Sequence, residues 1–271
     1  MAAIRIWHQS MAELDGMPAY RDALAAHLPR VLPPAAGTEV VLHGLPIGTY
    51  PAGAAPIDVL IHPYAYHLTM NRVLENVVQA EREGFDAVAL GSYSEPLLRE
   101  ARSIVSIPVA SMAEATLLVG CSMARSMAIV TVSREVARMT ERLVIGHGLE
   151  KRVGGVYVLD PPLNEHALAR AFDEPGPLLA SFAETARRGI GDGADLVIPA
   201  EGVFNEVLFA QTVQRLDDVS VMDCVGVTFL YAEMLVNLRR RTGLEVGRRW
   251  EYARPSPSVI AHVRQRVGLP P

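Results

Sequence analysis

Two stretches of the chain decide its fold: GFDAVALGS at residues 84–92 and GADLVIPAE at residues 193–201. In both, a glycine ends an amphipathic helical segment, an aspartate follows, and four apolar residues form a strand. Continuous apolar runs of this kind are typical of strands that are covered on both faces of a parallel sheet. A small residue and then a polar one, Ser92 or Glu201, come after each strand. The repeat therefore predicts two similar α/β units.

Short apolar runs alternate with longer amphipathic segments along the rest of the chain, which favours a parallel α/β fold. We predict strands at residues 4–7, 39–42, 87–90, 108–110, 128–131, 155–159, 196–199 and 220–222. We predict helices at residues 66–83, 95–103, 113–122, 134–147, 164–171, 177–189, 204–215 and 225–240. Open α/β sheets bind ligands at the carboxyl ends of their strands, so Ser92 and Glu201 are expected to face one crevice.

The composition excludes several classes of protein. Of the 271 residues, 50% are hydrophobic and 20% are charged, which permits a packed core and excludes global disorder. The net charge of −5 argues against nucleic acid as a partner. No apolar stretch reaches the ~18–20 residues of a membrane helix, and the first residues lack a secretory apolar block. We therefore expect a cytoplasmic protein that acts on a small molecule and binds neither nucleic acid nor membrane.

The counts of cysteine and lysine limit the chemistry further. Cys121 and Cys224 are too few for a disulfide framework or a four-thiolate zinc site, and we expect both to be inert core thiols. Lys151 is the only lysine among 25 basic residues, and its polar neighbours indicate a surface position. Because Schiff-base and pyridoxal-phosphate enzymes need a lysine amine in the site, lysine-based covalent catalysis is not expected.

Several segments, taken in order, resemble the aspartate/glutamate/hydantoin racemase superfamily, and its hydantoin racemase-like members above all. Residues 84–96 and 193–202 are similar to the two catalytic segments of that family. IPVASMAEA at residues 107–115 is similar to the segment that follows the first of them, and residues 248–253 to the closing strand.

This resemblance implies two similar Rossmann-like lobes with parallel sheets, related by a pseudo-twofold axis, with the active site in the crevice between them. We assign residues 1–110 and 223–271 to the first lobe, and residues 111–222 to the second. The resemblance also implies a homo-oligomer that uses no cofactor and no metal.

In this family two cysteines lie on opposite sides of the substrate's α-carbon, and one thiolate removes a proton while the opposite thiol delivers another. Here Ser92 stands in the first cysteine position and Glu201 in the second. An unactivated hydroxyl is no substitute for a thiolate base, so thiol-based racemisation is not expected. The resemblance then implies a cofactor-independent isomerase with Ser92 and Glu201 as catalytic residues. It would abstract a proton next to a carbonyl of a small carboxylate or a hydantoin-like cyclic amide.

Other interpretations of the same pair stay open. A hydrolase would use Ser92 as nucleophile or oxyanion donor and Glu201 as general base, and proton chemistry could also serve decarboxylation. A relative without both thiols could instead be an inactive protein that binds a small anion. Each residue also has a purely structural interpretation, because Ser92 and Glu95 fit a helix capping box and Glu201 fits a helix-start carboxylate.

Further residues are expected to bind substrate. Gln9 and Ser10 follow the first strand, and Tyr93 adjoins Ser92. Thr131 and Ser133 precede a helix whose first amides could bind an anionic group.

Two opposing effects act on the pKa of Glu201. Burial among apolar residues is expected to raise the pKa, and the amides of the following helix are expected to lower it. We expect burial to prevail when the lobes close on substrate.

Overall fold

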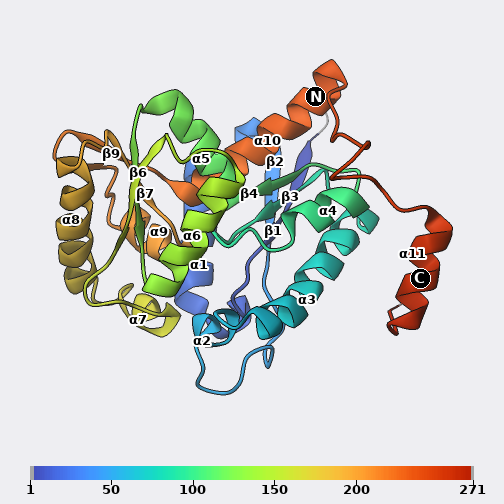
Figure 1. Ribbon diagram of the computed structural model, residues 1–271, viewed down its shortest axis with the longest axis horizontal. Helices are drawn as coiled ribbons and strands as arrows, with labels where there is room; N and C mark the ends of the chain where they lie inside the picture. The colour runs from blue at the N-terminus through green and yellow to red at the C-terminus, as the bar shows by residue number, and fades with distance from the viewer. Residues whose placement is uncertain (1–2, 270–271) are drawn as a thin grey trace.

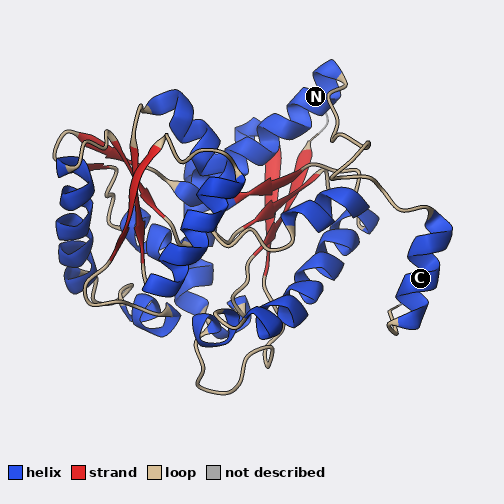
Figure 2. Cartoon of the chain, viewed as in Figure 1, coloured by secondary structure: helices blue, strands red, loops and turns tan. Residues whose placement is uncertain are grey.

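The computed structural model describes residues 3–269, which form two separate sheets with helices around them (Figure 1, Figure 2). The first sheet is parallel throughout and has the strand order β2-β1-β3-β4. Its strands are β1 (Ile4–Gln9), β2 (Thr38–His43), β3 (Ala87–Leu90) and β4 (Val109–Ser111). We call this sheet and the helices that pack on it the first lobe.

The second sheet has the order β6-β5-β7-β9-β8 and is parallel except at its β8–β9 edge. Its strands are β5 (Met127–Thr131), β6 (Val153–Val158), β7 (Leu196–Pro199), β8 (Arg215–Leu216) and β9 (Val219–Val221). The orders β2-β1-β3-β4 and β6-β5-β7-β9 follow one pattern, so the repeated stretches form equivalent strands, β3 and β7. The predicted α/β fold with two parallel sheets is confirmed; the second sheet and its helices are the second lobe.

Helices cover both faces of the first sheet. On one face, α3 (Pro63–Arg82) and α4 (Leu98–Ile104) bury Met70, Val73 and Leu98 against Val88 and Leu90. The other face packs against α1 (Pro18–Val31), α5 (Met112–Met123) and α10 (Cys224–Thr242). The second sheet packs against α6 (Arg134–Gly146) and α8 (Gly176–Gly191). The remaining helices are α2 (Pro56–Leu60), α7 (Glu165–Arg170), α9 (Gly202–Ala210) and α11 (Pro257–Arg266).

Three of these helices, α1, α2 and α11, were not predicted. Each has proline at its first position, where the ring's fixed φ suits a helix and no amide hydrogen bond is lost. In α1 a second proline, Pro29, lies in the last turn, where it obscures the helical pattern of the sequence. The helix α11 stands away from both lobes in Figure 1, and Arg264 joins it to Glu75 of α3 through two hydrogen bonds of 2.9 and 2.7 Å.

One predicted helix is too long, and one segment that resembles a strand of the family is not a strand here. The helix expected at residues 204–215 ends at Ala210, because Thr212 adopts a positive φ of 56° and Arg215 pairs with β9 instead. Residues 248–253, which resemble the closing strand of the family, form turns and no strand. The Arg248 side chain holds this segment by donating to the carbonyl oxygens of Arg102 and Val105, and within the described part of the chain the segment forms no backbone hydrogen bonds of the kind that pair strands.

A cluster of buried polar side chains joins α1 and α10, which pack on the first sheet, to α9, which follows β7 of the second sheet. His27 of α1 lies 2.8 Å from Glu206 Oε1 of α9 through Nδ1, and 2.8 Å from Asp223 Oδ2 through Nε2. Asn205 donates to both carboxylates and accepts the amide of Cys224, the first residue of α10. Burial alone would lower the pKa of His27, but the two carboxylates outweigh it and raise this pKa to about 9. We call these four residues, His27, Asn205, Glu206 and Asp223, the His27 cluster.

Across residues 3–269, every helix is too short or too polar to span a lipid bilayer.

Candidate active site

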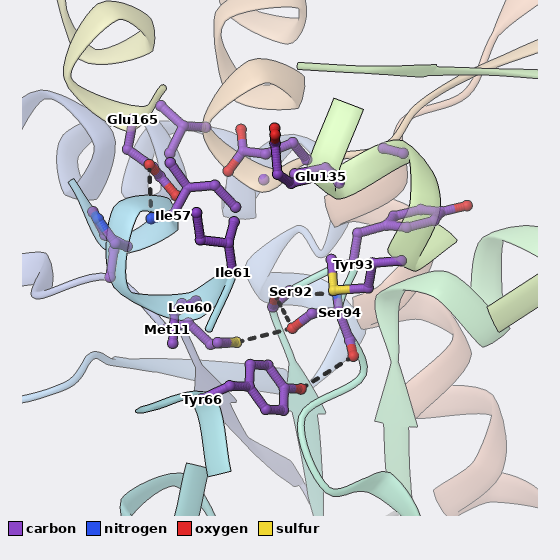
Figure 3. A pocket seen from close by; sticks show the side chains of 18 of the residues that line it. Met11, Ile57, Leu60, Ile61, Tyr66, Ser92, Tyr93, Ser94, Glu135 and Glu165 are labelled. Atoms are coloured by element: carbon purple, nitrogen blue, oxygen red, sulfur yellow. Dashed lines mark hydrogen bonds between the residues drawn. The ribbon is translucent and has the colours of Figure 1, made fainter. Parts of the chain in front are cut away.

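A cavity of about 480 Å³ lies where the two lobes meet, and Figure 3 shows it from close by. The first lobe contributes the chain after β1, the turn after β3, and α2 with the start of α3. The second lobe contributes one face of α6, the start of α7 and the start of α9. Most of the lining is apolar, and Ser92 and Glu201 both belong to it. The cavity thus lies at the carboxyl ends of β3 and β7, as the topology of such sheets requires.

The hydroxyl of Ser92 belongs to a short chain of polar groups on the first-lobe side. It lies 3.0 Å from the hydroxyl of Ser94 and accepts the Ser94 amide at 3.3 Å. Ser94 in turn donates to the sulfur of Met11 at 3.2 Å, as Figure 3 shows. Tyr66 donates to the Ser94 carbonyl oxygen at 3.3 Å and so fixes this turn against α3.

Ser92 is not a helix cap, so the capping-box interpretation is wrong. The helix α4 begins only at Leu98, and Glu95 and Leu97 before it both have positive φ, 50° and 49°. Glu95 turns instead toward α5, where it accepts the Ser111 hydroxyl at 2.6 Å and the Glu114 amide at 3.0 Å. It also contacts His147, the residue that follows α6, at 2.7 Å. Burial raises the pKa of Glu95, but His147 and Ser111 bring it below its usual value.

Glu201 is the N-cap of α9, as its helix-start interpretation predicts, and it also lines the cavity. Its Oε2 accepts the Phe204 amide at 2.6 Å. Burial is the largest influence on its pKa and the charge of Glu165 adds to it, whereas the amides of Phe204, Val203 and Gly202 act in the opposite direction. The result is a pKa of about 7. Burial therefore outweighs the helix amides already in this conformation. The expectation from the sequence is that burial prevails only when the lobes close on substrate, and the structure differs in this respect.

Glycines let the two strand ends approach closely. A Cβ atom on Gly202 would lie 3.4 Å from the carbonyl oxygen of Gly91 and 2.6 Å from the Tyr20 hydroxyl. A Cβ atom on Gly91 would lie 2.1 Å from Nε2 of His8, which is buried behind the turn. Gly202 therefore allows the start of α9 to lie against Tyr20 and the turn after β3, whereas Gly91 leaves room for His8 within the first lobe.

The structure brings only some of the predicted substrate-binding residues to the cavity. Ser10 and Tyr93 line it, although the Tyr93 hydroxyl accepts a hydrogen bond from Thr116. Gln9 is buried, and its amide is occupied by Trp7, Asn76 and the Ser10 carbonyl oxygen.

Two further predicted residues of the second lobe have local partners instead. Thr131 donates to the Ser133 carbonyl oxygen at 3.3 Å, and Ser133 caps α6 by accepting the Val136 amide at 3.3 Å. The lining of the cavity includes neither of them.

Several lining residues were not predicted from the sequence, and two of them, Tyr20 and Glu165, bear directly on Glu201. Tyr20 lies on the unpredicted helix α1, is fully buried and points its hydroxyl toward Gly202. Glu165 opens α7, where an acidic residue has an ordinary structural explanation in the helix dipole. The sequence offered a signal for neither residue, because their roles depend on contacts between the lobes.

The outer part of the cavity is polar and charged. Glu135, Arg138 and Arg142 lie on the face of α6 that borders it, and all three are exposed. The inner carboxylates are Glu165 and Glu201, which are half-buried. Within residues 3–269, no three histidine, cysteine, aspartate or glutamate side chains are grouped to hold a metal ion.

Neither cysteine contributes to the lining of the cavity. Cys224 is fully buried, its thiol donates to the Pro199 carbonyl oxygen at 3.2 Å, and burial raises its pKa well above the usual value. Cys121 lies on α5 and is half-buried.

The chain is similar to known proteins along most of its length. A family model described as Asp/Glu/Hydantoin racemase matches residues 52–232. A hydantoin racemase of Pseudomonas sp. (strain NS671) is 26% identical over 180 residues, which are 66% of this chain and 70% of that protein. A hydantoin racemase of Rhizobium meliloti is 26% identical over 164 residues, 60% of this chain and 66% of that protein.

Solved structures share the fold. An allantoin racemase from Klebsiella pneumoniae superposes with a TM-score of 0.74 at 24% identity, covering 94% of both chains. An allantoin racemase from Pseudomonas fluorescens gives a TM-score of 0.75 at 23% identity, covering 94% of this chain and 98% of the other.

Proposed function

Because this chain belongs to the Asp/Glu/hydantoin racemase family, we propose that it racemises a neutral cyclic amide of the hydantoin type with Glu201 as the base. The single observation that supports this most is the state of Glu201 in the cavity. A carboxylate with a pKa of about 7 is partly ionised at neutral pH and returns a proton readily. Such a group suits removal of the weakly acidic hydrogen next to a ring carbonyl.

The charges of the cavity favour a cyclic amide over an amino-acid substrate. The half-buried groups, Glu165 and Glu201, are both acids, whereas Arg138 and Arg142 are exposed at the rim. A substrate carboxylate beside Glu201 would place two negative charges in a poorly solvated space, which is unfavourable. A neutral ring avoids this repulsion, and the relatives named hydantoin racemase and allantoin racemase act on such rings.

Ser92 supports the second half of the reaction. We propose that Glu201 takes the hydrogen from one face of the ring, which leaves an enolate. The Ser92 hydroxyl, on the first-lobe side of the cavity, then donates a proton to the opposite face of that carbon. Ser92 regains its proton from solvent through Ser94, whose hydroxyl is 3.0 Å away, and Glu201 releases the proton that it took. In the reverse direction the two hydroxyls pass the proton of the opposite face to solvent hydroxide, while protonated Glu201 returns a proton to its own face.

Hydrolysis is less well supported by the same geometry. A serine nucleophile needs a base that accepts its proton. The contacts of the Ser92 hydroxyl among the described residues are the hydroxyl and amide of Ser94, and neither is such a base.

The proposed function is tested with one enantiomer of 5-benzylhydantoin in D₂O. We expect optical rotation to decay to zero while deuterium enters the C5 position, followed by polarimetry and proton NMR. Ring opening, followed by chromatography, would instead identify a hydrolase. Binding without exchange or ring opening would identify an inactive anion- or ring-binding protein.

A further inference from the structure

The side chain of Glu165 bridges the two lobes in the inner wall of the interlobe cavity. The residue opens α7 of the second lobe, directly after Asn164, whose side chain accepts the Ala167 amide at 3.0 Å. Its Oε2 accepts the amide of Ile57, in α2 of the first lobe, at 3.2 Å, as the dashed line in Figure 3 shows. Glu165 is therefore held at a defined place in the cavity wall.

The helix dipole accounts for an acid at the start of α7, but burial in the cavity wall and the neighbouring carboxylate of Glu201 add a cost to a charge at this place. Burial raises the pKa of Glu165, and the nearby charge of Asp58 raises it as well. The amides of Glu165 itself and Ile57 counteract burial, as does His166. A neutral glutamine would accept the Ile57 amide through its oxygen equally well and would not oppose the ionisation of Glu201. Unlike a glutamine, the carboxylate also offers a second acceptor oxygen to a ligand in the cavity that it lines.

We propose that Glu165 is a substrate-binding residue whose carboxylate accepts a ring N–H of the cyclic amide. This inference rests on the proposed function, because it concerns the substrate of the same site. A hydantoin-type ring offers N–H donors beside its carbonyl groups, and a carboxylate is the acceptor that forms the stronger, charge-assisted hydrogen bond with them. One oxygen of Glu165 stays on Ile57 and the other faces the ligand.

The same carboxylate selects against acidic compounds. A ligand carboxylate at this position would meet the negative charges of Glu165 and Glu201 together. An acceptor in place of a ring N–H would leave the Glu165 oxygen without a donor, which is a costly arrangement in a half-buried place. Glu165 therefore distinguishes the closed, neutral ring from the ring-opened carbamoyl acid.

The test measures binding rather than turnover, by equilibrium dialysis of 5-benzylhydantoin and its N1-methyl and N3-methyl derivatives. Glu165→Gln should weaken binding of the parent ring about tenfold, as loss of one charge-assisted hydrogen bond requires. It should change the affinity of one methyl derivative, the one that lacks the recognised N–H, by less than about twofold. N-carbamoylphenylalanine should bind Glu165→Gln more tightly than the wild type. Glu174→Gln removes an exposed carboxylate close to α7 and is the matched control.

The outcomes separate this inference from the proposed function. Equal losses for the parent ring and both methyl derivatives would show that the charge of Glu165 acts on the cavity as a whole and not through one ring N–H, and would overturn the inference. An unchanged affinity for the parent ring would overturn it as well, even if the wild type racemises the ring. N–H-dependent binding through Glu165 without any deuterium exchange would support the inference and refute the proposed function. Circular dichroism and the melting temperature of each variant verify that it folds.

Discussion

The chain after β3 and the chain after β7 start from equivalent places in the two sheets and then differ. After β7, Glu201 passes directly into α9, whose first amides hold its carboxylate. After β3, an irregular turn with positive φ at Glu95 and Leu97 delays the next helix until Leu98. The second lobe thus supplies a fixed carboxylate, and the first supplies a hydroxyl linked to a second hydroxyl. Duplicated strands position the groups, whereas the turn that follows each strand determines their chemistry.

The largest expected effect is on the second-lobe side of this comparison. Glu201→Gln keeps the size of the side chain and an oxygen for the Phe204 amide but removes the base. We expect the rate of racemisation to fall at least ~100-fold, the lower end for general-base catalysis. Binding of 5-benzylhydantoin, measured by equilibrium dialysis, should change far less. Near-normal turnover would mean that Glu201 only caps α9.

The first-lobe side is tested with Ser92→Ala. Racemisation should fall ~100-fold, the lower end for a general acid, because the opposite face loses its proton donor. Exchange of deuterium into the enantiomer whose hydrogen faces Glu201 should persist, so this enantiomer should gain deuterium without inverting. Comparing NMR exchange with polarimetry for each enantiomer measures the difference. Parallel loss of exchange and racemisation would contradict separate roles for the two sides.

The pH dependence sharpens the assignment of the base. With a pKa of about 7, Glu201 is ionised above that pH, so kcat/KM should fall about tenfold per pH unit below it. The free energy of unfolding changes with pH in the opposite direction to the activity. Because the folded state raises the pKa of Glu201, the protonated side chain stabilises the folded protein at low pH. This contribution, on the order of 3 kcal/mol, is lost as pH rises from about 4.5 through about 7. Urea unfolding of the wild type and Glu201→Gln at pH 5 and pH 8 measures it; an equal pH response in both proteins would refute the shift.

The smallest expected effect concerns the cysteines. Neither Cys121 nor Cys224 lines the cavity, so changing both to alanine should leave kcat/KM largely unchanged once folding is verified. Iodoacetamide should not inactivate the wild type. Rapid inactivation that substrate prevents would assign Cys224 a direct role and would remove the contrast between the two strand ends.

Local patterns predicted the strands better than the site. The apolar runs at residues 87–90 and 196–199 became β3 and β7 without a shift, because buried parallel strands are continuously apolar. The capping box at Ser92 failed because Glu95 turns to α5 and His147, partners that are remote in sequence.

Other errors have the same origin. Gln9 has a position suited to a ligand, yet Trp7 and Asn76 occupy its amide, which only the packed structure reveals. Tyr20 and Glu165 reach the cavity through the docking of helices from different lobes. The periodicity of apolar residues predicts which segments form helices or strands and which of their faces are buried. It carries no information about which side chains of different elements come into contact.

The His27 cluster limits how this enzyme can admit a ligand. His27 ties α1, the helix of Tyr20, to α9, the helix that Glu201 opens, and to the start of α10. Breaking a buried ion pair of this kind costs about 3–5 kcal/mol, so a hinge motion that separates α1 from α9 would seldom occur. By contrast, α2 is five residues long, and the described contact between its Ile57 amide and α7 is one hydrogen bond, to Glu165. If a ring binds as proposed, its entry and exit should therefore proceed by displacement of α2, while Ser92 and Glu201 keep their positions behind it.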